Sequence, residues 1–219
     1  MKFLDCEKQD GIYIVTMKDG QNRIRSEVMA EHHQIMDQIA KDRDNTAVIL
    51  TSSDEKFWCN GIDVDWLMQQ PSEYFPEFTN LCDELILRWS LFDAPTIACI
   101  TGHCYGGGAV VAACMDFRIM REDRGFYCFP EVDVHIPFTE VMHDVIELLP
   151  NKAIVHEMIL TGRRVGGQEA SSKDLVHACY NQEELFSKAM ELATHLKSKD
   201  RATYSKIKTG LKKHLLKWR

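Results

Sequence analysis

Apolar and polar residues alternate near the start of the chain and then change to a helical spacing. The alternation across Gly11 to Met17 predicts a β-strand, because successive side chains of a strand point to opposite faces. From Val28 to Ile39, apolar residues recur every three or four positions, which is the spacing of one face of an α-helix. The continuous apolar run Ala47 to Leu50 predicts a buried strand, which the turn-forming segment 51–54 ends.

The pattern continues through the rest of the chain. The next elements that it predicts are a helix at 74–87, a strand at 96–100, a helix at 109–115 and a strand at 116–120. From Phe138 onward the spacing is almost wholly helical, apart from a glycine-containing break at 161–167 and a weak strand candidate at 175–179. We therefore predict one α/β protein, with a core at residues 1–137 and a helical region at residues 138–219.

The last stretch of the chain, Lys206 to Arg219, is strongly basic and carries apolar residues at helical spacing. These apolar residues are Ile207, Leu211, Leu215 and Leu216. We expect a final amphipathic helix that packs through them and leaves its basic face in solvent. Elsewhere the chain has no basic face, since its formal net charge is -7. A nucleic-acid partner is therefore not expected.

Composition narrows the class of protein further. The eight cysteines fall mostly inside apolar segments and none is spaced as CxxC, which indicates buried thiols in a reducing compartment and no metal site. No apolar run reaches the roughly 18 residues that a membrane span needs. The acidic Asp5 and Glu7 do not suit a transit peptide, and the last three residues are not a peroxisomal signal. We expect a soluble, cytoplasmic protein that binds neither a membrane nor a metal.

Three consecutive glycines, Gly106 to Gly108, follow a predicted buried strand and lead directly into a helix. Such a turn leaves backbone N–H groups unpaired at the positive end of the helix, where they favour negative charge. The spacing is neither that of a Walker loop nor that of a dinucleotide fingerprint. Phosphate binding, oxyanion stabilisation and close packing of strand on helix all remain open for this turn.

A second stretch, Lys56 to Val64, follows the buried strand at 47–50. Its glycine, Gly61, permits a tight turn that would present the N–H group of Ile62. The alternative is an ordinary loop between a strand and a helix, with Asp63 as the helix cap.

Both stretches resemble motifs of the crotonase family, and two further segments strengthen the resemblance. Phe129-Pro130-Glu131-Val132 is similar to the family's "PE" strand. Leu160-Thr161-Gly162, followed by Gln168-Glu169-Ala170, is similar to its "LTG…A" segment. The four motifs occur in the family's order, and the resemblance covers nearly the whole chain from Gly11 onward.

The resemblance implies a crotonase-like spiral of ββα repeats with a helical C-terminal trimerisation region. It further implies an acyl-CoA thioester as substrate, held by an oxyanion hole made of the backbone N–H groups of Ile62 and Gly107. The residues expected to bind the coenzyme around them are Lys56, Asn60, Gly61, Asp63, Gly106 and Gly108, although Lys56 is equally suited to a solvated surface position. No separate cofactor is implied, because coenzyme A belongs to the substrate, and the expected partner is a second copy of the chain, in a trimer or a dimer of trimers.

Glu131 is the single carboxylate that the resemblance assigns to catalysis. Family hydratases use two glutamates, but the first of these positions falls on Val110, which cannot activate water. One carboxylate suits transfer of a proton from one carbon to another, and the segment Met120 to Gly125 is also similar to delta3-delta2-enoyl-CoA isomerases. We expect burial to raise the pKa of Glu131. The alternatives are a hydratase, racemase, hydrolase or decarboxylase of the family, a non-catalytic acyl-CoA binder, or a Glu131 that only pairs with Arg121 or Arg124.

The chain departs from the family pattern at His135, which replaces a glycine four residues after Glu131. This histidine is either a structural residue or a second acid–base group. Four large side chains are candidates for the acyl channel or for the core, namely Trp58, Trp66, Leu67 and Met68.

Overall fold

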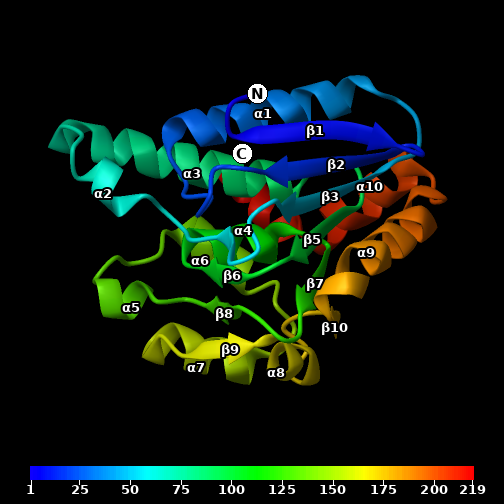
Figure 1. Ribbon diagram of the computed structural model, residues 1–219. Coiled ribbons are helices and arrows are strands. Elements are labelled where there is room, and N and C mark those ends of the chain that lie inside the picture. Colours follow the sequence, from blue (N-terminus) through cyan, green and yellow to red (C-terminus); the bar gives the residue numbers. More distant parts are fainter.

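The computed structural model describes all 219 residues and has two β-sheets surrounded by helices (Figure 1). The larger sheet has six strands in the order β1-β2-β3-β5-β7-β10, and the smaller sheet has four in the order β4-β6-β8-β9. The strands are β1 (Leu4–Gln9), β2 (Ile12–Met17), β3 (Ala47–Ser52), β4 (Phe57–Cys59), β5 (Thr96–Ile100), β6 (His103–Tyr105), β7 (Phe117–Arg121), β8 (Phe126–Cys128), β9 (Arg164–Gly166) and β10 (Ala178–Tyr180).

The helices connect and cover these strands. They are α1 (Ser26–Lys41), α2 (Val64–Leu67), α3 (Phe75–Ser90), α4 (Gly107–Cys114), α5 (Glu131–Val134), α6 (Glu140–Ile146), α7 (Lys152–Thr161), α8 (Gly167–Ser172), α9 (Gln182–Lys197) and α10 (Arg201–Leu211). Two 3₁₀ segments complete them, η1 (Ser72–Tyr74) and η2 (Lys213–Trp218). No helix has both the length and the apolar character of a membrane span.

The chain alternates between the two sheets. Strands β3, β5 and β7 run parallel in the large sheet, and each is followed by one strand of the small sheet, β4, β6 or β8, and then by a helix. This repetition of two strands and a helix is the spiral that the sequence resemblance implies. The region 138–219 adds β9 antiparallel to β8 and β10 parallel to β7, so it contributes a strand to each sheet.

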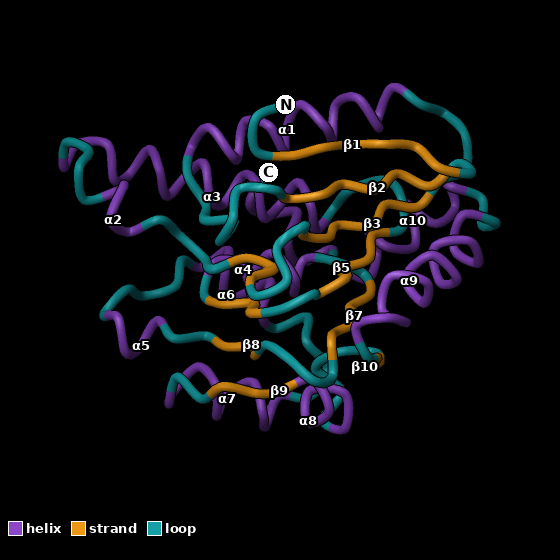
Figure 2. The backbone as a smooth tube through the Cα atoms, in the orientation of Figure 1, coloured by secondary structure: helices purple, strands orange, loops and turns teal.

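The larger sheet is covered on both faces (Figures 1 and 2). Helix α9 packs on β3, β5 and β7 and forms a small apolar cluster with them. The main core lies on the opposite side, where α1, α3, α4 and α6 contribute to a cluster of 48 buried residues. All eight cysteines are free thiols, and six of them are buried.

Local patterns predicted the interior elements well. Helix α1 buries the face that the apolar spacing indicates, namely Val28, Met29, His32, Ile35, Met36 and Ile39. The buried strands predicted at 47–50 and 96–100 are β3 and β5, and both are wholly buried. The weak candidate at 175–179 corresponds to the short strand β10, which begins three residues later.

Two expectations were wrong. Glu131 is not on a strand, because β8 ends at Cys128 and Glu131 begins the one-turn helix α5. In α10 and its C-cap, Lys212, the burial is the reverse of the expected one: Ile207 and Leu211 are 60% and 77% exposed, whereas Lys208 and Lys212 are 4% and 8% exposed. Of the four apolar residues in the tail, only Leu215 is fully buried.

A buried carboxylate explains why the lysines of this segment face inward and its apolar residues face outward. Asp116, the residue before β7, forms salt bridges with the Nζ atoms of Lys208 at 2.7 Å and of Lys212 at 2.9 Å. Lys208 also donates to the carbonyl of Ala94, and Lys212 donates to the carbonyl of Cys114. Burial lowers the pKa of Lys208 to about 8, while the two lysines lower the pKa of Asp116 against the opposing effect of its burial. The buried charge of Asp116 needs the two lysines as partners, and this requirement decides which face of α10 is buried.

We expect Asp116→Asn to lower the free energy of unfolding by about 3 to 5 kcal/mol, because two buried ammonium groups lose their counter-ion. Urea unfolding at pH 7 measures the change. Asp37→Asn is the matched control, since Asp37 pairs with Arg88 but its side chain is 61% exposed. The control should cost less than about 1 kcal/mol. Equal effects of the two substitutions would contradict a structural role for the buried network.

Candidate active site

Two backbone turns meet at the centre of the candidate site. Gly61 and Gly106 have φ angles of 74° and 54°, a left-handed conformation that favours glycine. A methyl group built on Gly61 would lie 2.9 Å from the carbonyl oxygen of Tyr105 and 3.2 Å from the amide nitrogen of Gly107. The turns are therefore in direct backbone contact, which a side chain at Gly61 would prevent.

The amides of Ile62 and Gly107 are unpaired and lie close together. Neither N–H group donates a hydrogen bond within the protein, and Gly107 is the first residue of α4. A methyl group built on Gly107 would lie 3.8 Å from the amide nitrogen of Ile62. Two such donors on adjacent turns, one of them at a helix N-terminus, are suited to stabilise one oxyanion.

Asp63 holds the first turn in place. Its carboxylate caps α2 by accepting a hydrogen bond from the amide of Trp66 at 3.3 Å. It also accepts from Arg23 at 3.2 Å and from Arg25 at 3.3 Å. The helix-cap interpretation of Asp63 is thus correct. It is compatible with an unpaired Ile62 amide, because the cap holds Asp63 in place directly after Ile62.

Residues 22–25 were not recognised from the sequence. Ile24 donates to the carbonyl of Gly61 at 2.8 Å and accepts from the amide of Asp63 at 3.1 Å, so it forms a one-residue β-bridge with Ile62. Its side chain also packs against Gly107. The alternation Arg23-Ile24-Arg25 is the only signal in the sequence, and it carries no indication of what the residues contact.

Glu131 lies against the glycine turn without a partner. Its Oε1 atom would be 3.3 Å from a methyl group built on Gly106, and its Oε2 atom is buried and makes no hydrogen bond. Arg121 pairs instead with Asp123, at 2.7 Å and 2.8 Å, and Arg124 forms no salt bridge. The interpretation of Glu131 as an ion-pair partner of either arginine was therefore wrong.

Burial raises the pKa of Glu131 from its ordinary value of 4.5 to about 7. A carboxylate with this pKa is a stronger base than an exposed glutamate, and it exchanges protons readily near neutral pH. The environment of Glu131 thus suits a group that both accepts and returns a proton.

A cavity of about 340 Å³ opens beside Glu131. Its other lining residues are Val132, His135, Ile136, Pro137, Phe138, His143 and Ile159. His135 ends α5 in a left-handed conformation, with φ of 58°, which explains why a glycine would suit this position. Val110 is completely buried in α4, so that helix supplies no second carboxylate to the site.

The remaining candidates do not all contact the site. A methyl group on Gly108 would lie 2.6 Å from the carbonyl oxygen of Cys59, so close packing accounts for this glycine. Lys56 extends over the ring of Phe57, and Asn60 donates to Gln21 at 2.8 Å. Of the two alternatives for Trp58, acyl channel or core, the core is correct, because this side chain is fully buried and donates to the carbonyl of Leu50.

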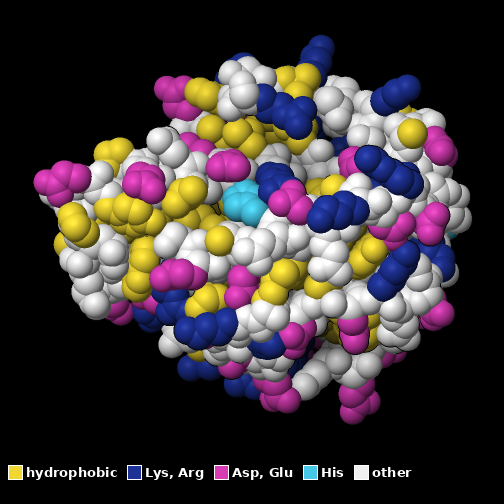
Figure 3. Space-filling model, turned by 90° about the horizontal axis from the view of Figure 1, so that it is seen from above, with side chains coloured by type: hydrophobic (Ala, Val, Ile, Leu, Met, Phe, Trp, Pro, Cys, Tyr) yellow, Lys and Arg dark blue, Asp and Glu magenta, His cyan; other side chains and the backbone are white.

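Trp66, Leu67 and Met68 lie instead on a projecting part of the molecule. The end formed by α2 and the start of α3 extends from the body in Figure 1, and Figure 3 shows hydrophobic side chains gathered over it. Met68 is 68% exposed there, while Trp66 packs against Tyr74 and Phe78. This apolar surface directly follows the turn that presents Ile62.

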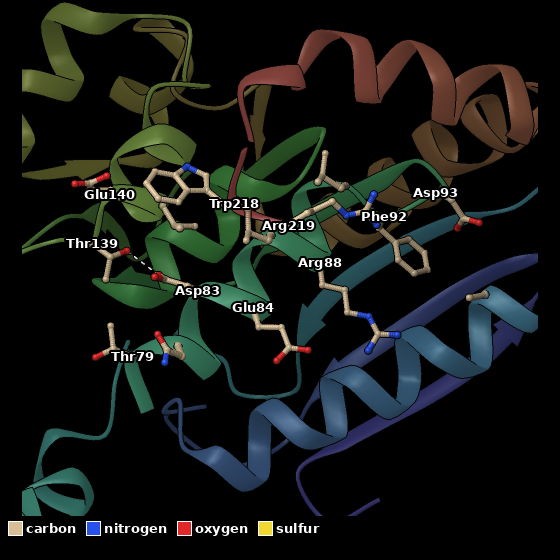
Figure 4. Close-up of a pocket in the computed structure, with 15 residues that line it drawn as sticks. Thr79, Asp83, Glu84, Arg88, Phe92, Asp93, Thr139, Glu140, Trp218 and Arg219 are labelled. Atoms are coloured by element: carbon tan, nitrogen blue, oxygen red, sulfur yellow. Dashed lines mark hydrogen bonds between the residues drawn. The ribbon is translucent and has the colours of Figure 1, made fainter. Parts of the chain in front are cut away.

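A larger cavity, of about 950 Å³, lies along the outer side of α3, between α1, α6 and the C-terminus (Figure 4). It contains neither Glu131 nor the two unpaired amides. Asp83 accepts a hydrogen bond from Thr139 at 2.7 Å, and Arg88 is paired with Asp37. Nowhere in the chain do three or more metal-ligating side chains converge. This cavity is therefore separate from the candidate site around Glu131.

The model of the enoyl-CoA hydratase/isomerase family matches residues 7–217. Because this match spans almost the whole chain, the protein belongs to that family. The fold agrees, since the crystal structure of an enoyl-CoA hydratase from Geobacillus kaustophilus superposes with a TM-score of 0.86 at 26% identity, covering 96% of this chain and 80% of that one. The crotonase resemblance of the sequence is confirmed.

Curated relatives carry names of several reactions. "Enoyl-CoA delta isomerase 1, peroxisomal" of Arabidopsis thaliana is 26% identical over 216 residues, which are 96% of this chain and 90% of that protein. "Carnitinyl-CoA dehydratase" of Escherichia coli K12 is 31% identical over 180 residues, which are 80% of this chain and 66% of that protein. The family is thus defined, whereas the reaction has to be argued from the site.

We expect Glu131→Gln to stabilise the protein at alkaline pH. The folded protein holds the proton of Glu131 more tightly than the unfolded chain does, so stability present below pH 4.5 is lost as the pH rises through about 7. The variant should therefore exceed the wild type by about 3 kcal/mol at pH 8.5 and match it near pH 4.5. Urea unfolding at both pH values measures this, and an equal difference at both would contradict the raised pKa.

Proposed function

We propose that the protein is a delta3-delta2-enoyl-CoA isomerase, which moves a double bond from C3 to C2 of an acyl-CoA thioester. The observation that carries this proposal is one carboxylate with a buried, unpaired oxygen beside two unpaired backbone amides, with valine at the helix position where a second carboxylate would be needed. Isomerisation needs one group to move one proton, whereas hydration also needs a group that activates water.

The mechanism follows from the positions of these groups. The thioester oxygen accepts hydrogen bonds from the amides of Ile62 and Gly107. Glu131 then removes a proton from C2, and the electron pair of that C–H bond spreads into a dienolate whose charge rests largely on this oxygen. Glu131 returns the same proton to C4, which leaves the double bond between C2 and C3. Each amide contributes about 3 kcal/mol of transition-state stabilisation, and no cofactor is required beyond the coenzyme A of the substrate.

A hydratase or dehydratase is the alternative with a specific observation in its favour. His135 and His143 line the cavity with Glu131, so either could supply a second acid–base group. The name of the Escherichia coli relative also fits such a reaction. We prefer isomerisation, because neither histidine forms a hydrogen bond or salt bridge with Glu131 and because the buried oxygen of its carboxylate has no partner with which to hold water.

The first test is to incubate the protein with a trans-3-enoyl-CoA and follow formation of the conjugated 2-enoyl-CoA by absorbance. Wild type should isomerise it, and Glu131→Gln should lower kcat by about a hundredfold or more, as expected for loss of a general base. Glu183→Gln, which makes the same chemical change at an exposed position of α9 away from the site, is the matched control. A 3-hydroxy product from a 2-enoyl-CoA would favour the hydratase, and an unaffected Glu131→Gln variant would refute the mechanism.

We also propose that the region 138–219 joins copies of this chain into a trimer or a dimer of trimers. Helix α10 supports the proposal, because its buried lysines turn Ile207 and Leu211 outward onto its surface. Exposed apolar side chains one helical turn apart are typical of a contact surface. The basic Lys206 and Lys213 flank them, and neither forms a salt bridge within the chain.

Leu211→Asp should therefore reduce the molecular mass of the assembly without unfolding the chain, because a charge would be buried at a contact between copies. Light scattering after size-exclusion chromatography measures the mass, and circular dichroism checks the fold. Gln38→Asp, at an exposed position of α1, should leave the mass unchanged. A monomeric wild type would sink the proposal, as would a variant with the wild-type mass.

A further inference from the structure

Tyr127 connects the strand that precedes Glu131 to the helix that begins at Gly107. It belongs to β8 and its side chain is fully buried. Its hydroxyl donates a 2.7 Å hydrogen bond to the backbone carbonyl of Ala109, and its ring packs edge-on against Phe129. The hydroxyl therefore joins the strand that leads to Glu131 to the first turn of the helix that begins at Gly107.

A backbone hydrogen bond makes a second link between the same segments. The amide of Gly106 donates to the carbonyl of Cys128 at 3.0 Å. Pairing with β6 on one side and β9 on the other fixes β8 within the small sheet. The two bonds add a connection from the end of β8 to the glycine turn and to α4, just before the chain continues to Glu131.

The Glu131 side chain has no direct support of its own. Its Oε2 atom has no hydrogen-bond partner, and no cation pairs with its carboxylate. Catalytic groups are commonly oriented by neighbouring groups that bond to them. Here the position of the carboxylate depends on the backbone between Cys128, at the end of β8, and Glu131, three residues later. A misplacement of about 1 Å in a reacting group costs about a hundredfold in rate.

We propose that Tyr127 is a positioning residue that holds Glu131 at a fixed distance from the amides of Ile62 and Gly107. The inference rests on the proposed function, because transfer of a proton between C2 and C4 requires the carboxylate to be aligned with the bound thioester. Tyr127 does not reach the substrate, since its hydroxyl is buried and already bonded to Ala109.

Tyr127→Phe tests the proposal, because it removes the hydroxyl and keeps the ring. We expect kcat to fall about tenfold while KM stays unchanged, as misalignment without loss of binding predicts. The acid limb of the kcat/KM profile should move to lower pH, because water reaches a carboxylate that is held less tightly. The matched control is Tyr13→Phe in β2, which removes a 2.8 Å hydrogen bond from Tyr13 to Asp42 and should leave kcat and the profile unchanged.

A ¹³C NMR titration of Glu131 in the free protein separates this inference from the proposed function. A lower Glu131 pKa in Tyr127→Phe supports positioning even where the wild type does not isomerise enoyl-CoA, an outcome that would refute only the function. Lower thermal stability with an unchanged pKa and unchanged kcat would overturn the inference. So would an equal loss of kcat after site-specific insertion of 3-fluorotyrosine at position 127, because that residue retains the hydroxyl.

Discussion

The site depends on the contact between two backbone turns. Gly61 and the turn that begins at Gly106 approach so closely that one added carbon atom on Gly61 would collide with the carbonyl of Tyr105. This contact leaves two amides, of Ile62 and Gly107, without partners and near one another. Unpaired N–H donors lower the stability of the protein when no ligand is bound. They are also free to donate hydrogen bonds to a bound group that carries negative charge.

Glu131 likewise is a polar group whose lack of a partner costs stability. Burial without a partner makes its charged form unfavourable, and the raised pKa expresses this cost. The surrounding structure supplies the compensating stability elsewhere, through a large apolar core and the buried network of Asp116, Lys208 and Lys212. Function and stability are thus located in different parts of the molecule. The candidate site lies on the segments that follow strands of the small sheet, whereas the charge network connects Lys208 and Lys212 to Asp116, next to β7 of the large sheet.

The repeated strand–strand–helix unit explains how distant residues meet. Each repeat carries the chain from the large sheet into the small one, so the segments that follow β4, β6 and β8 lie side by side. The first of these segments presents Ile62, the second presents Gly107 and the third presents Glu131. The same strand–strand–helix connection, repeated three times, therefore brings the two unpaired amides and Glu131 together from stretches spread over about a third of the chain.

Local order in the sequence determined much of the fold and the chemical identity of the site. The face of α1, the buried strands β3 and β5, the glycine turns and Glu131 all follow from periodicity or from short motifs, because the responsible residues are near one another in the chain. Only the tertiary structure decided which face of α10 is buried, because its lysines form salt bridges with Asp116, about ninety residues earlier in the chain. It likewise decided the arginine support of Asp63 and the bond from Tyr127 to Ala109, since partners of buried polar groups are set by packing, which a one-dimensional pattern does not contain.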